Sequence, residues 1–248
     1  MQPRGTVCGV DAQTSRIVRH FTVDVVIPAL NEAATIGMVL EEIPFSKLED
    51  RGFVARAVVV DNGSTDGTAD IAKAAGAEVI FEPQRGKGNA MRRAFSETKA
   101  DYVVMLDGDA TYPATHIPDM LDVLRDGHDV VIGSRLKGKR APGSISRVNV
   151  IGNHLLTWVA CVLYGRRTSD LCTGYWAFRG SALPLLHLTA RGFNLEAELF
   201  SEVARNDLRM GEVPVNYRRR PTPTKLRALR DGWRIASMLL RKRFRRNG

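Results

Sequence analysis

Two aspartates one residue apart, Asp107 and Asp109, follow directly on the apolar run from Tyr102 to Leu106. A run so rich in β-branched and aliphatic residues predicts a strand that is buried on both faces. Two carboxylates this close repel each other, and burying either of them is costly. A divalent cation resolves the conflict, because Mg²⁺ and Mn²⁺ prefer carboxylate oxygens and often hold substrate phosphates as well. The alternative is a solvated acidic turn after an ordinary strand.

Polar or glycine-rich residues also follow two other expected strands. The strand expected at 23–28 leads into the segment from Pro28 to Glu32, and the strand expected at 57–61 ends at Asp61. In open parallel sheets, ligands bind beyond the carboxyl ends of the strands. The convergence of three such segments therefore favours a ligand site over a chance acidic turn.

Expected strands and helices alternate along the chain at the spacing of βαβ units. The strands are expected at 23–28, 57–61, 78–81, 102–106 and 130–132, and the helices at 31–42, 68–75, 90–98 and 114–125. Asn31 is the expected N-cap of the first helix. The pattern predicts an α/β fold with a mostly parallel sheet and helices on both faces, followed by a largely helical C-terminal region.

Composition limits the class of protein. At 248 residues and 44% hydrophobic content, the chain can form one large α/β domain or two small ones. Its formal charge of +9 indicates an anionic partner. The three cysteines lack the spacing of a disulfide framework or a zinc site, which fits a reducing cytosol. Residues 1–20 are expected to be a poorly ordered leader and not a signal peptide, and no apolar run reaches the roughly 20 residues that span a bilayer.

The C-terminal residues 225–248 are expected to form a basic amphipathic helix. Apolar residues recur near the helical period at Leu226, Leu229, Trp233, Ala236, Leu240 and Phe244. With arginines on the remaining surface, the pattern is typical of a helix in a membrane interface against anionic lipid, and the alternative is a helix docked on the protein's own core. For 225–236 both stay open, whereas for 238–246 the density of like charge favours the interface. The stretch 151–164, with Trp158 and Tyr164, could also contact lipid, but it is expected to be a buried core helix.

Eight motifs in order carry a resemblance to a known family. They are VVIPALNEAATIG from Val25, VVVDNGSTDGT from Val58, RGKGNAMRRA from Arg85, DYVVMLDGDATYP from Asp101, VVIGSR from Val130, DLCTGYWAFR from Asp170, FNLEAEL from Phe193 and EVPVNYRRR from Glu212. Over residues 22–230 the chain resembles the family 2 glycosyltransferases with the Rossmann-like GT-A fold. It is most similar to the polyprenyl-phosphate sugar synthases of the dolichyl-phosphate mannose and glucose type. The resemblance implies inverting transfer of a hexose from GDP-mannose or UDP-glucose to a polyprenyl phosphate.

The resemblance also implies a donor site. Asp107 and Asp109 would bind Mg²⁺ or Mn²⁺, which bridges to the donor diphosphate. The residues expected to bind the nucleotide sugar are Pro28, Ala29, Asn31, Glu32, Asp61, Gly86, Lys87, Asp107, Gly108 and Asp109. Around Lys87, backbone N–H groups and the ammonium could meet a phosphate. Two positions depart from the family pattern, since Asn62 stands where a second acid is usual and Thr111 where an amide is usual.

The acceptor end of the site is expected to be basic. Arg135 has a guanidinium suited to forked phosphate recognition and is expected to take part in catalysis. The candidates for binding an acceptor phosphate are Arg135, Arg147, Arg219 and Lys225, with Arg140 and Arg220 as weaker ones. If the acceptor is a hydroxyl, Asp170 or Glu196 could be the general base, with Glu196 ahead of Glu198. A phosphate acceptor is already an anion and needs no base.

Two rival functions stay open. One keeps the enzyme class but uses a soluble hydroxyl compound or a growing glycan as acceptor. The other is nucleic-acid binding through the arginine-rich tail, which offers only Trp233 and Phe244 for base stacking, so no nucleic-acid partner is expected. The expected partners are a nucleoside diphosphate sugar, a polyprenyl phosphate lipid and an anionic membrane surface. Residues 21–224 would be the catalytic domain of a cytoplasmic protein, peripheral on the inner face of the membrane.

Overall fold

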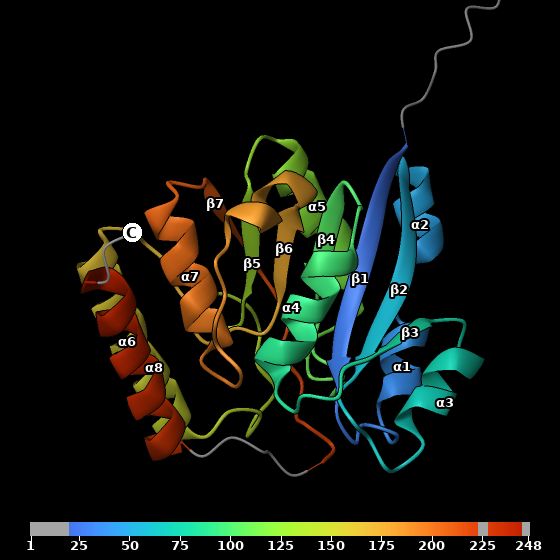
Figure 1. The fold of residues 1–248 in the computed structure, drawn as a ribbon, viewed down its shortest axis with the longest axis horizontal. Coiled ribbons are helices and arrows are strands. Elements are labelled where there is room, and N and C mark those ends of the chain that lie inside the picture. The colour runs from blue at the N-terminus through green and yellow to red at the C-terminus, as the bar shows by residue number, and fades with distance from the viewer. Residues whose placement is uncertain (1–19, 223–227, 245–248) are drawn as a thin grey trace, which may run out of the picture.

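The computed structural model describes residues 20–222 and 228–244, so the expected leader lies outside the described residues except for His20. The strands are β1 Phe21–Ala29, β2 Phe53–Asp61, β3 Glu78–Phe81, β4 Tyr102–Met105, β5 Val130–Ser134, β6 Trp176–Arg179 and β7 Met210–Pro214. The α-helices are α1 Ile36–Glu41, α2 Phe45–Asp50, α3 Thr68–Ala74, α4 Lys87–Glu97, α5 Ile117–Arg125, α6 Arg147–Tyr164, α7 Leu195–Arg205 and α8 Ala228–Phe244 (Figure 1). Two short 3₁₀ helices are η1 Ala114–His116 and η2 Gly180–Leu185.

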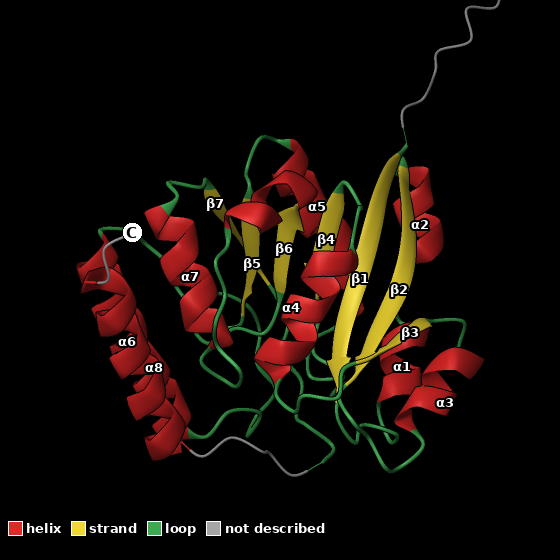
Figure 2. Cartoon of the chain, viewed as in Figure 1, coloured by secondary structure: helices red, strands yellow, loops and turns green. Residues whose placement is uncertain are grey.

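The strands form one sheet in the order β3-β2-β1-β4-β6-β5-β7. All neighbours run parallel except β6, which is antiparallel to both β4 and β5. Helices α1, α2, α3 and α5 contribute to the apolar core on one face, and α4, α6, α7 and α8 to the core on the other (Figure 2). The predicted α/β sheet with helices on both faces is therefore confirmed.

Strand β4 shows why the sequence folds this way. All four of its residues are buried, and successive side chains enter opposite cores because the period of a strand is two. Val104 lies in the core beside α1 and α5, whereas Val103 and Met105 lie in the core beside α4 and α7. A strand apolar at every position suits only the middle of a covered sheet. The acidic residues after β4 are thereby held at the centre of one sheet edge.

The start of the first helix differs from the expectation. Helix α1 begins at Ile36 with Thr35 as N-cap, so the predicted capping role of Asn31 is wrong. Asn31 instead has a φ of 53° in a left-handed turn, and its Oδ1 accepts a hydrogen bond from the Thr65 backbone N–H at 2.8 Å. Asparagine tolerates this conformation, so the residue joins two loops at the sheet edge and caps no helix.

Helix α8 packs on the body of the protein beside α6 and α7. It buries Ile235, Met238 and Leu239 in the core that α7 shares. The Tyr164 hydroxyl of α6 donates a hydrogen bond of 2.9 Å to the Leu239 carbonyl. The expectation that like charge keeps 238–246 from close packing is therefore wrong for the described residues up to Phe244. The helix packs through a second apolar face, formed by Ile235, Met238 and Leu239. This face differs from the exposed apolar stripe that the sequence pattern predicted.

A third correction concerns helix α6, because residues 151–164 do not form a buried core helix. Asn153, Thr157 and Ala160 face the protein, while Ile151 and Trp158 are more than 60% exposed. Within the described residues, no helix combines the length and apolarity that crossing a bilayer requires.

Candidate functional site

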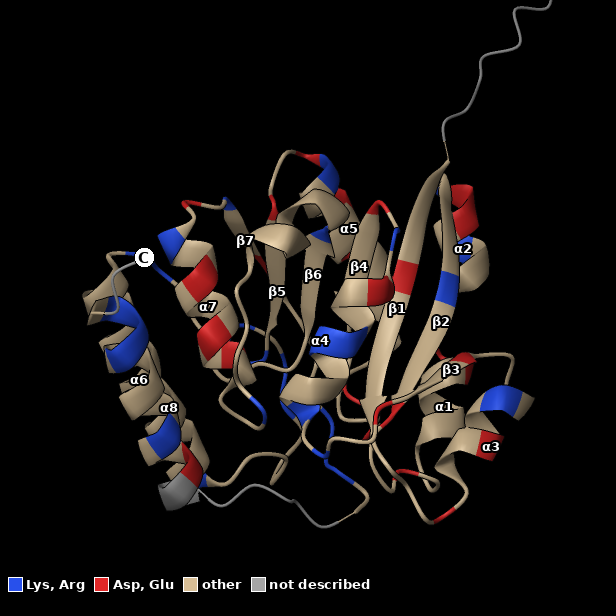
Figure 3. Ribbon diagram, viewed as in Figure 1, with Lys and Arg blue, Asp and Glu red and all other residues tan. Residues whose placement is uncertain are grey.

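The carboxyl ends of β1, β2 and β4 meet at one edge of the sheet, at the bottom of Figure 1. Ala29 of β1 pairs with Asp61 of β2, so the segment after β1 lies beside the predicted donor-binding aspartate. Asp107 and Asp109 follow β4 on the other side of β1. The three segments that sequence reasoning assigned to one site are thus neighbours in space. Figure 3 shows basic and acidic segments gathering at this edge.

Lys87 joins two carboxylates that are far apart in the sequence. It is the first residue of α4, and its Nζ lies 2.6 Å from Asp107 Oδ1 and 2.7 Å from Oε1 of Glu196, the second residue of α7. Burial disfavours the Lys87 ammonium, but the two carboxylates outweigh it and raise its pKa. Burial raises the pKa of Glu196, although Lys87 opposes the shift. The predicted residues Lys87, Asp107 and Glu196 therefore form one charged cluster.

Asp109 is held by a second set of contacts. Its Oδ1 accepts hydrogen bonds from the Thr111 N–H at 3.1 Å and the Thr111 hydroxyl at 2.6 Å. Its Oδ2 lies 3.1 Å from Nη1 of Arg220, whose Nη2 lies 2.8 Å from Glu32 Oε1. Burial raises the pKa of Asp109, and the like charge of Asp107 raises it further. Asp107 and Asp109 therefore place two mutually repelling carboxylates at the end of β4. Carboxylate oxygens are hard ligands, so this pair fits a divalent cation.

Gly174 is a site residue that sequence reasoning missed. A Cβ atom on Gly174 would lie 2.1 Å from Asp107 Oδ2, so the carboxylate rests directly on the backbone of the segment before β6. The Gly174 N–H donates a 2.8 Å hydrogen bond to the hydroxyl of buried Tyr112, which fixes that backbone. Asp107 is thus confined between Lys87 and a glycine. The signal in the sequence was a glycine just before the Tyr175–Phe178 apolar run.

The turn before α4 is fixed by an amide. Asn62 Nδ2 donates to the carbonyls of Glu82 at 2.9 Å and Gln84 at 2.8 Å, and its Oδ1 accepts from the Gly86 N–H. A carboxylate could not donate the first two bonds. The departure from the family pattern at Asn62 therefore has a structural reason, because this residue shapes the loop that presents Lys87. Beside it, Asp61 Oδ1 accepts from the Ser64 N–H at 3.1 Å.

Arg135 and Asp170 form a buried pair. Nε and Nη2 of Arg135 lie 2.8 and 2.6 Å from the two carboxylate oxygens, and Asn153 Nδ2 donates a further bond of 2.6 Å to Oδ1. Burial would raise the pKa of Asp170, but the Arg135 charge and these hydrogen bonds lower it. The fork of Arg135, predicted to bind phosphate, is therefore already occupied. Asp170, named as a candidate base, is the fully buried partner of this arginine.

The other predicted basic residues are scattered. Arg147 is the exposed first residue of α6, Arg219 is exposed after β7, and Lys225 lies outside the described residues. The backbone of Arg140 forms an isolated bridge with Tyr217. It is Arg220, ranked below Arg219 from the sequence, that reaches the acidic pair. Among the predicted donor residues, Gly108 is buried and its carbonyl accepts a 2.7 Å hydrogen bond from the Thr35 hydroxyl.

Glu198, the weaker candidate base, belongs to a buried network behind the site. Its carboxylate accepts hydrogen bonds from the N–H groups of Thr189 and Ala190 at 2.8 and 2.6 Å. Lys242 of α8 reaches in and places Nζ 2.9 Å from both Glu198 and Glu202. A Cβ atom on Gly88 would lie 2.0 Å from the Ala190 carbonyl oxygen, and a Cβ atom on Gly86 would lie 2.0 Å from the Arg191 carbonyl oxygen. The network thus fixes residues 189–191, against which the turn before α4 packs.

Replacing Lys242 by methionine is expected to raise KM for the donor and to lower the free energy of unfolding by about 3 kcal/mol. Two buried carboxylates would lose their shared counter-charge, and the 189–191 segment would shift. Thermal unfolding and a comparison of KM with kcat test this. Arg241→Met is the matched control, since Arg241 is exposed one residue away. Equal melting temperatures and equal KM values for the two variants would contradict the positioning role.

The covered, mostly parallel sheet with an acidic pair after its central strand matches the GT-A class of nucleotide-sugar transferases. The chain belongs to glycosyl transferase family 2, whose sequence model matches residues 24–185. The predictions of the family, the GT-A fold and glycosyltransferase activity are thereby confirmed.

Named relatives agree with this assignment. The chain is 39% identical over 221 residues to glycosyltransferase AglJ of Haloferax volcanii, which covers 88% of this chain and 71% of that protein. It is 35% identical over 218 residues to dolichyl-phosphate hexose transferase of the same organism, covering 88% and 92%. Among solved structures, glucosyl-3-phosphoglycerate synthase from Mycobacterium tuberculosis with Mn²⁺, UDP-glucose and phosphoglyceric acid matches with a TM-score of 0.70 and 28% identity, covering 92% of this chain and 82% of that one.

Proposed function

We propose that this protein transfers a hexose, with inversion, from a nucleoside diphosphate sugar to a polyprenyl phosphate. The observation that carries the proposal is the meeting of Asp107, Asp109 and Lys87 at the carboxyl edge of the sheet. The similarity to a dolichyl-phosphate hexose transferase supports a lipid phosphate as acceptor. GDP-mannose and UDP-glucose are the proposed donors, and the structural similarity to a protein solved with UDP-glucose supports a donor of this kind.

Asp107 and Asp109 would hold the divalent ion, Mg²⁺ or Mn²⁺. Among the described residues there is no group of three or more His, Cys, Asp or Glu side chains that could hold a metal, so diphosphate oxygens and water would complete its shell. When bound, the ion neutralises charge that develops on the leaving diphosphate.

The chain's own residues then have distinct tasks. Lys87, kept charged by its neighbours, stands at the N-terminus of α4, where the helix dipole and backbone N–H groups also favour phosphate. Arg220 orients Asp109 and Glu32 together. An oxygen of the acceptor phosphate attacks the anomeric carbon, the bond from that carbon to the diphosphate oxygen breaks, and the nucleoside diphosphate leaves. No proton has to be removed from an ionised phosphate, so Glu196 can remain engaged with Lys87.

A soluble hydroxyl acceptor is the second candidate, because the similar mycobacterial structure contains phosphoglyceric acid. With such an acceptor, Glu196 would act as general base, and the raised pKa of this carboxyl suits a proton acceptor. The nucleic-acid hypothesis is set aside, since the chain belongs to a glycosyltransferase family.

Replacing Glu196 by glutamine separates the two acceptors. With a polyprenyl phosphate we expect transfer to fall by less than about tenfold, because Asp107 still holds Lys87 and no base is needed. Turnover with lipid phosphate and with phosphoglyceric acid, together with calorimetric binding of the nucleoside diphosphate, provides the measurement. A loss of about 100-fold or more with donor binding intact would instead support a hydroxyl acceptor.

Peripheral association with the cytoplasmic face of the membrane completes the proposal, because a polyprenyl acceptor is anchored in lipid. In α8, Trp233, Leu240 and Phe244 of the predicted apolar stripe are exposed. They lie among the exposed arginines 234, 241 and 243, which supports contact with anionic lipid.

A further inference from the structure

Helix α6 exposes a row of large apolar side chains to solvent. Val148, Ile151, Leu155, Trp158 and Val162 are each between 60% and 69% exposed. Their spacing of three and four residues puts them on one face, as a stripe along the whole helix. A row of five large apolar side chains in water is unusual for a protein surface and marks a contact with a partner. We call this row the α6 stripe.

The face of α6 turned toward the protein combines apolar residues such as Leu156 and Ala160 with two buried polar residues. Asn153 bonds Asp170, and Thr157 Oγ1 accepts a 3.1 Å hydrogen bond from the Leu171 N–H. These contacts fix the rotation of the helix, because turning it to bury the α6 stripe would leave the buried Asp170 without one of its donors. The outward direction of the stripe is therefore set by the packing behind the helix.

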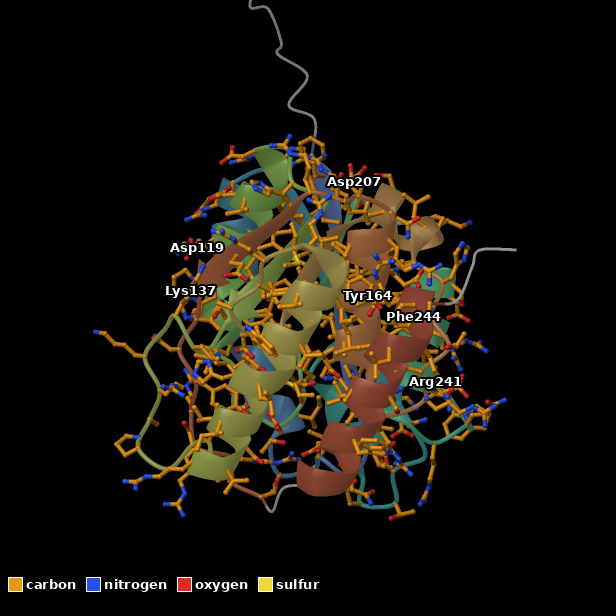
Figure 4. All side chains as sticks on the ribbon, turned by 90° about the vertical axis from the view of Figure 1, so that its left-hand side faces the viewer. Asp119, Lys137, Tyr164, Asp207, Arg241 and Phe244 are labelled. Atoms are coloured by element: carbon orange, nitrogen blue, oxygen red, sulfur yellow. The ribbon has the colours of Figure 1, made fainter. Side chains whose placement is uncertain are left out.

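The surroundings of the α6 stripe are basic. Helices α6 and α8 lie side by side on this side of the protein, where Figure 4 labels Tyr164, Arg241 and Phe244. The sequence of α6 contains no acidic residue, and the one acid of α8, Asp231, is buried. Exposed arginines stand at both ends of the stripe, at Arg147 and Arg167.

An apolar stripe with arginines around it distinguishes between the partners that could cover it. A second copy of the chain docking face to face would bring arginines against arginines with no exposed acid on either described helix to pair them, and like charges across an interface are costly. An anionic lipid surface receives the apolar side chains and attracts the arginines at the same time. We propose that the α6 stripe, with the exposed side of α8, docks this protein on an anionic lipid surface.

The position of the face suits a lipid acceptor, and this part of the inference rests on the proposed function. Helices α6 and α8 both begin at the level of the sheet edge that carries Asp107, as Figure 1 shows. Docking along α6 would place the first residues of both helices, which lie at the end of the protein that carries this edge, at the lipid headgroups. In this proposal α6 makes most of the apolar contact with the lipid, whereas the sequence pattern assigned that contact to the C-terminal helix.

The test is flotation of the full chain with vesicles of phosphatidylcholine alone and with vesicles that also contain about 30% phosphatidylglycerol as the anionic lipid. We expect binding to the anionic vesicles that weakens as salt rises. The triple variant Ile151→Gln, Leu155→Gln, Trp158→Gln should reduce bound protein at least about tenfold, since each loses apolar area worth about 1.5–3 kcal/mol when buried. The control triple Met38→Gln, Phe45→Gln, Val54→Gln changes exposed apolar residues elsewhere and should float like the wild type.

Three outcomes would overturn the inference. They are absence of wild-type binding, equal binding by the two triple variants, and a dimer in sedimentation velocity that only the α6 variant abolishes. Failure of the proposed function is separate, because it is read from transfer to a short-chain polyprenyl phosphate without vesicles. In this vesicle-free assay the α6 triple variant should transfer sugar at the wild-type rate. If both proteins are inactive while the wild type still floats with anionic vesicles, the proposed acceptor is refuted and the proposed docking face is not.

Discussion

Replacing Asp107 by alanine is expected to lower kcat/KM for sugar transfer by about 10³-fold or more. The site would lose one of its two carboxylate ligands for the divalent ion and hence much of the stabilisation of the leaving diphosphate. Lys87 would keep Glu196 as its partner, so the charged turn before α4 should stay in place. The same loss is expected for Asp109→Ala, which also frees Arg220 from one of its two carboxylates.

Two measurements check this prediction. Transfer is assayed with saturating Mn²⁺, and the enhancement of nucleoside diphosphate affinity by Mn²⁺ is measured by calorimetry. We expect that enhancement to disappear in both variants while the melting temperature stays close to the wild-type value. Asp119→Ala, which removes an exposed aspartate from α5, should change neither quantity. Metal-enhanced binding that survives in Asp107→Ala would remove the basis of the proposed function.

The second large effect is expected from Gly174→Ala, a change that touches no predicted ligand. The new methyl group would lie 2.1 Å from Asp107 Oδ2, so the carboxylate must move. A displacement of about 1 Å in a catalytic arrangement costs about 100-fold in rate, and we expect kcat to fall by that factor. On its other side the Asp107 carboxylate contacts Lys87 Nζ at 2.6 Å, so a shift of the carboxylate would also disturb this ion pair.

Gly152→Ala provides the matched control. Nothing lies within 4 Å of the Cβ position on Gly152, which is inside α6, so this variant should gain about 0.5–1 kcal/mol of stability and keep full activity. The measurements are kcat, thermal unfolding and Mn²⁺-enhanced nucleotide binding for both variants. Undiminished turnover in Gly174→Ala would show that the position of Asp107 is not confined as described.

The sheet and its ligand edge were predictable because both depend on local patterns. An apolar run such as 102–106 indicates a covered strand, and the carboxyl ends of parallel strands share an edge, so Asp61, Asp107 and Asp109 could be grouped from the sequence. The antiparallel insertion of β6 could not be predicted, since its four residues, Trp176–Arg179, carry no sign of strand direction.

Side-chain partners were harder to predict than strand ends. An arginine suited to phosphate is equally suited to a carboxylate, and Asp170 is brought to Arg135 only by folding. Arg219 and Arg220 are adjacent in a segment without helical or strand period, so nothing local distinguishes the exposed one from the one that binds Asp109. Lys87 and Glu196 are 109 residues apart in sequence, and only the tertiary fold brings the first turns of α4 and α7 together.

The helices at the end of the sheet show a further limit. Residues 147–164 form a helix with apolar side chains on two sides, so the rule that apolar side chains face inward does not identify the exposed row. The buried side also includes polar Asn153, because Asp170 needs it as a donor. In α8 two apolar faces exist, and the stripe with the cleaner period is the one that includes exposed Trp233 and Phe244.

The family match ends at residue 185, yet Glu196 and Arg220 lie beyond it. A fragment cut at that boundary would retain both aspartates after β4 but would lack the glutamate beside Lys87, the arginine beside Asp109 and edge strand β7. Anyone recombining this enzyme with a homologue to exchange donor preference should therefore keep residues 21–222 and α8 together, because a shorter graft would separate these charged partners, Lys242 from Glu198 and Glu202 included.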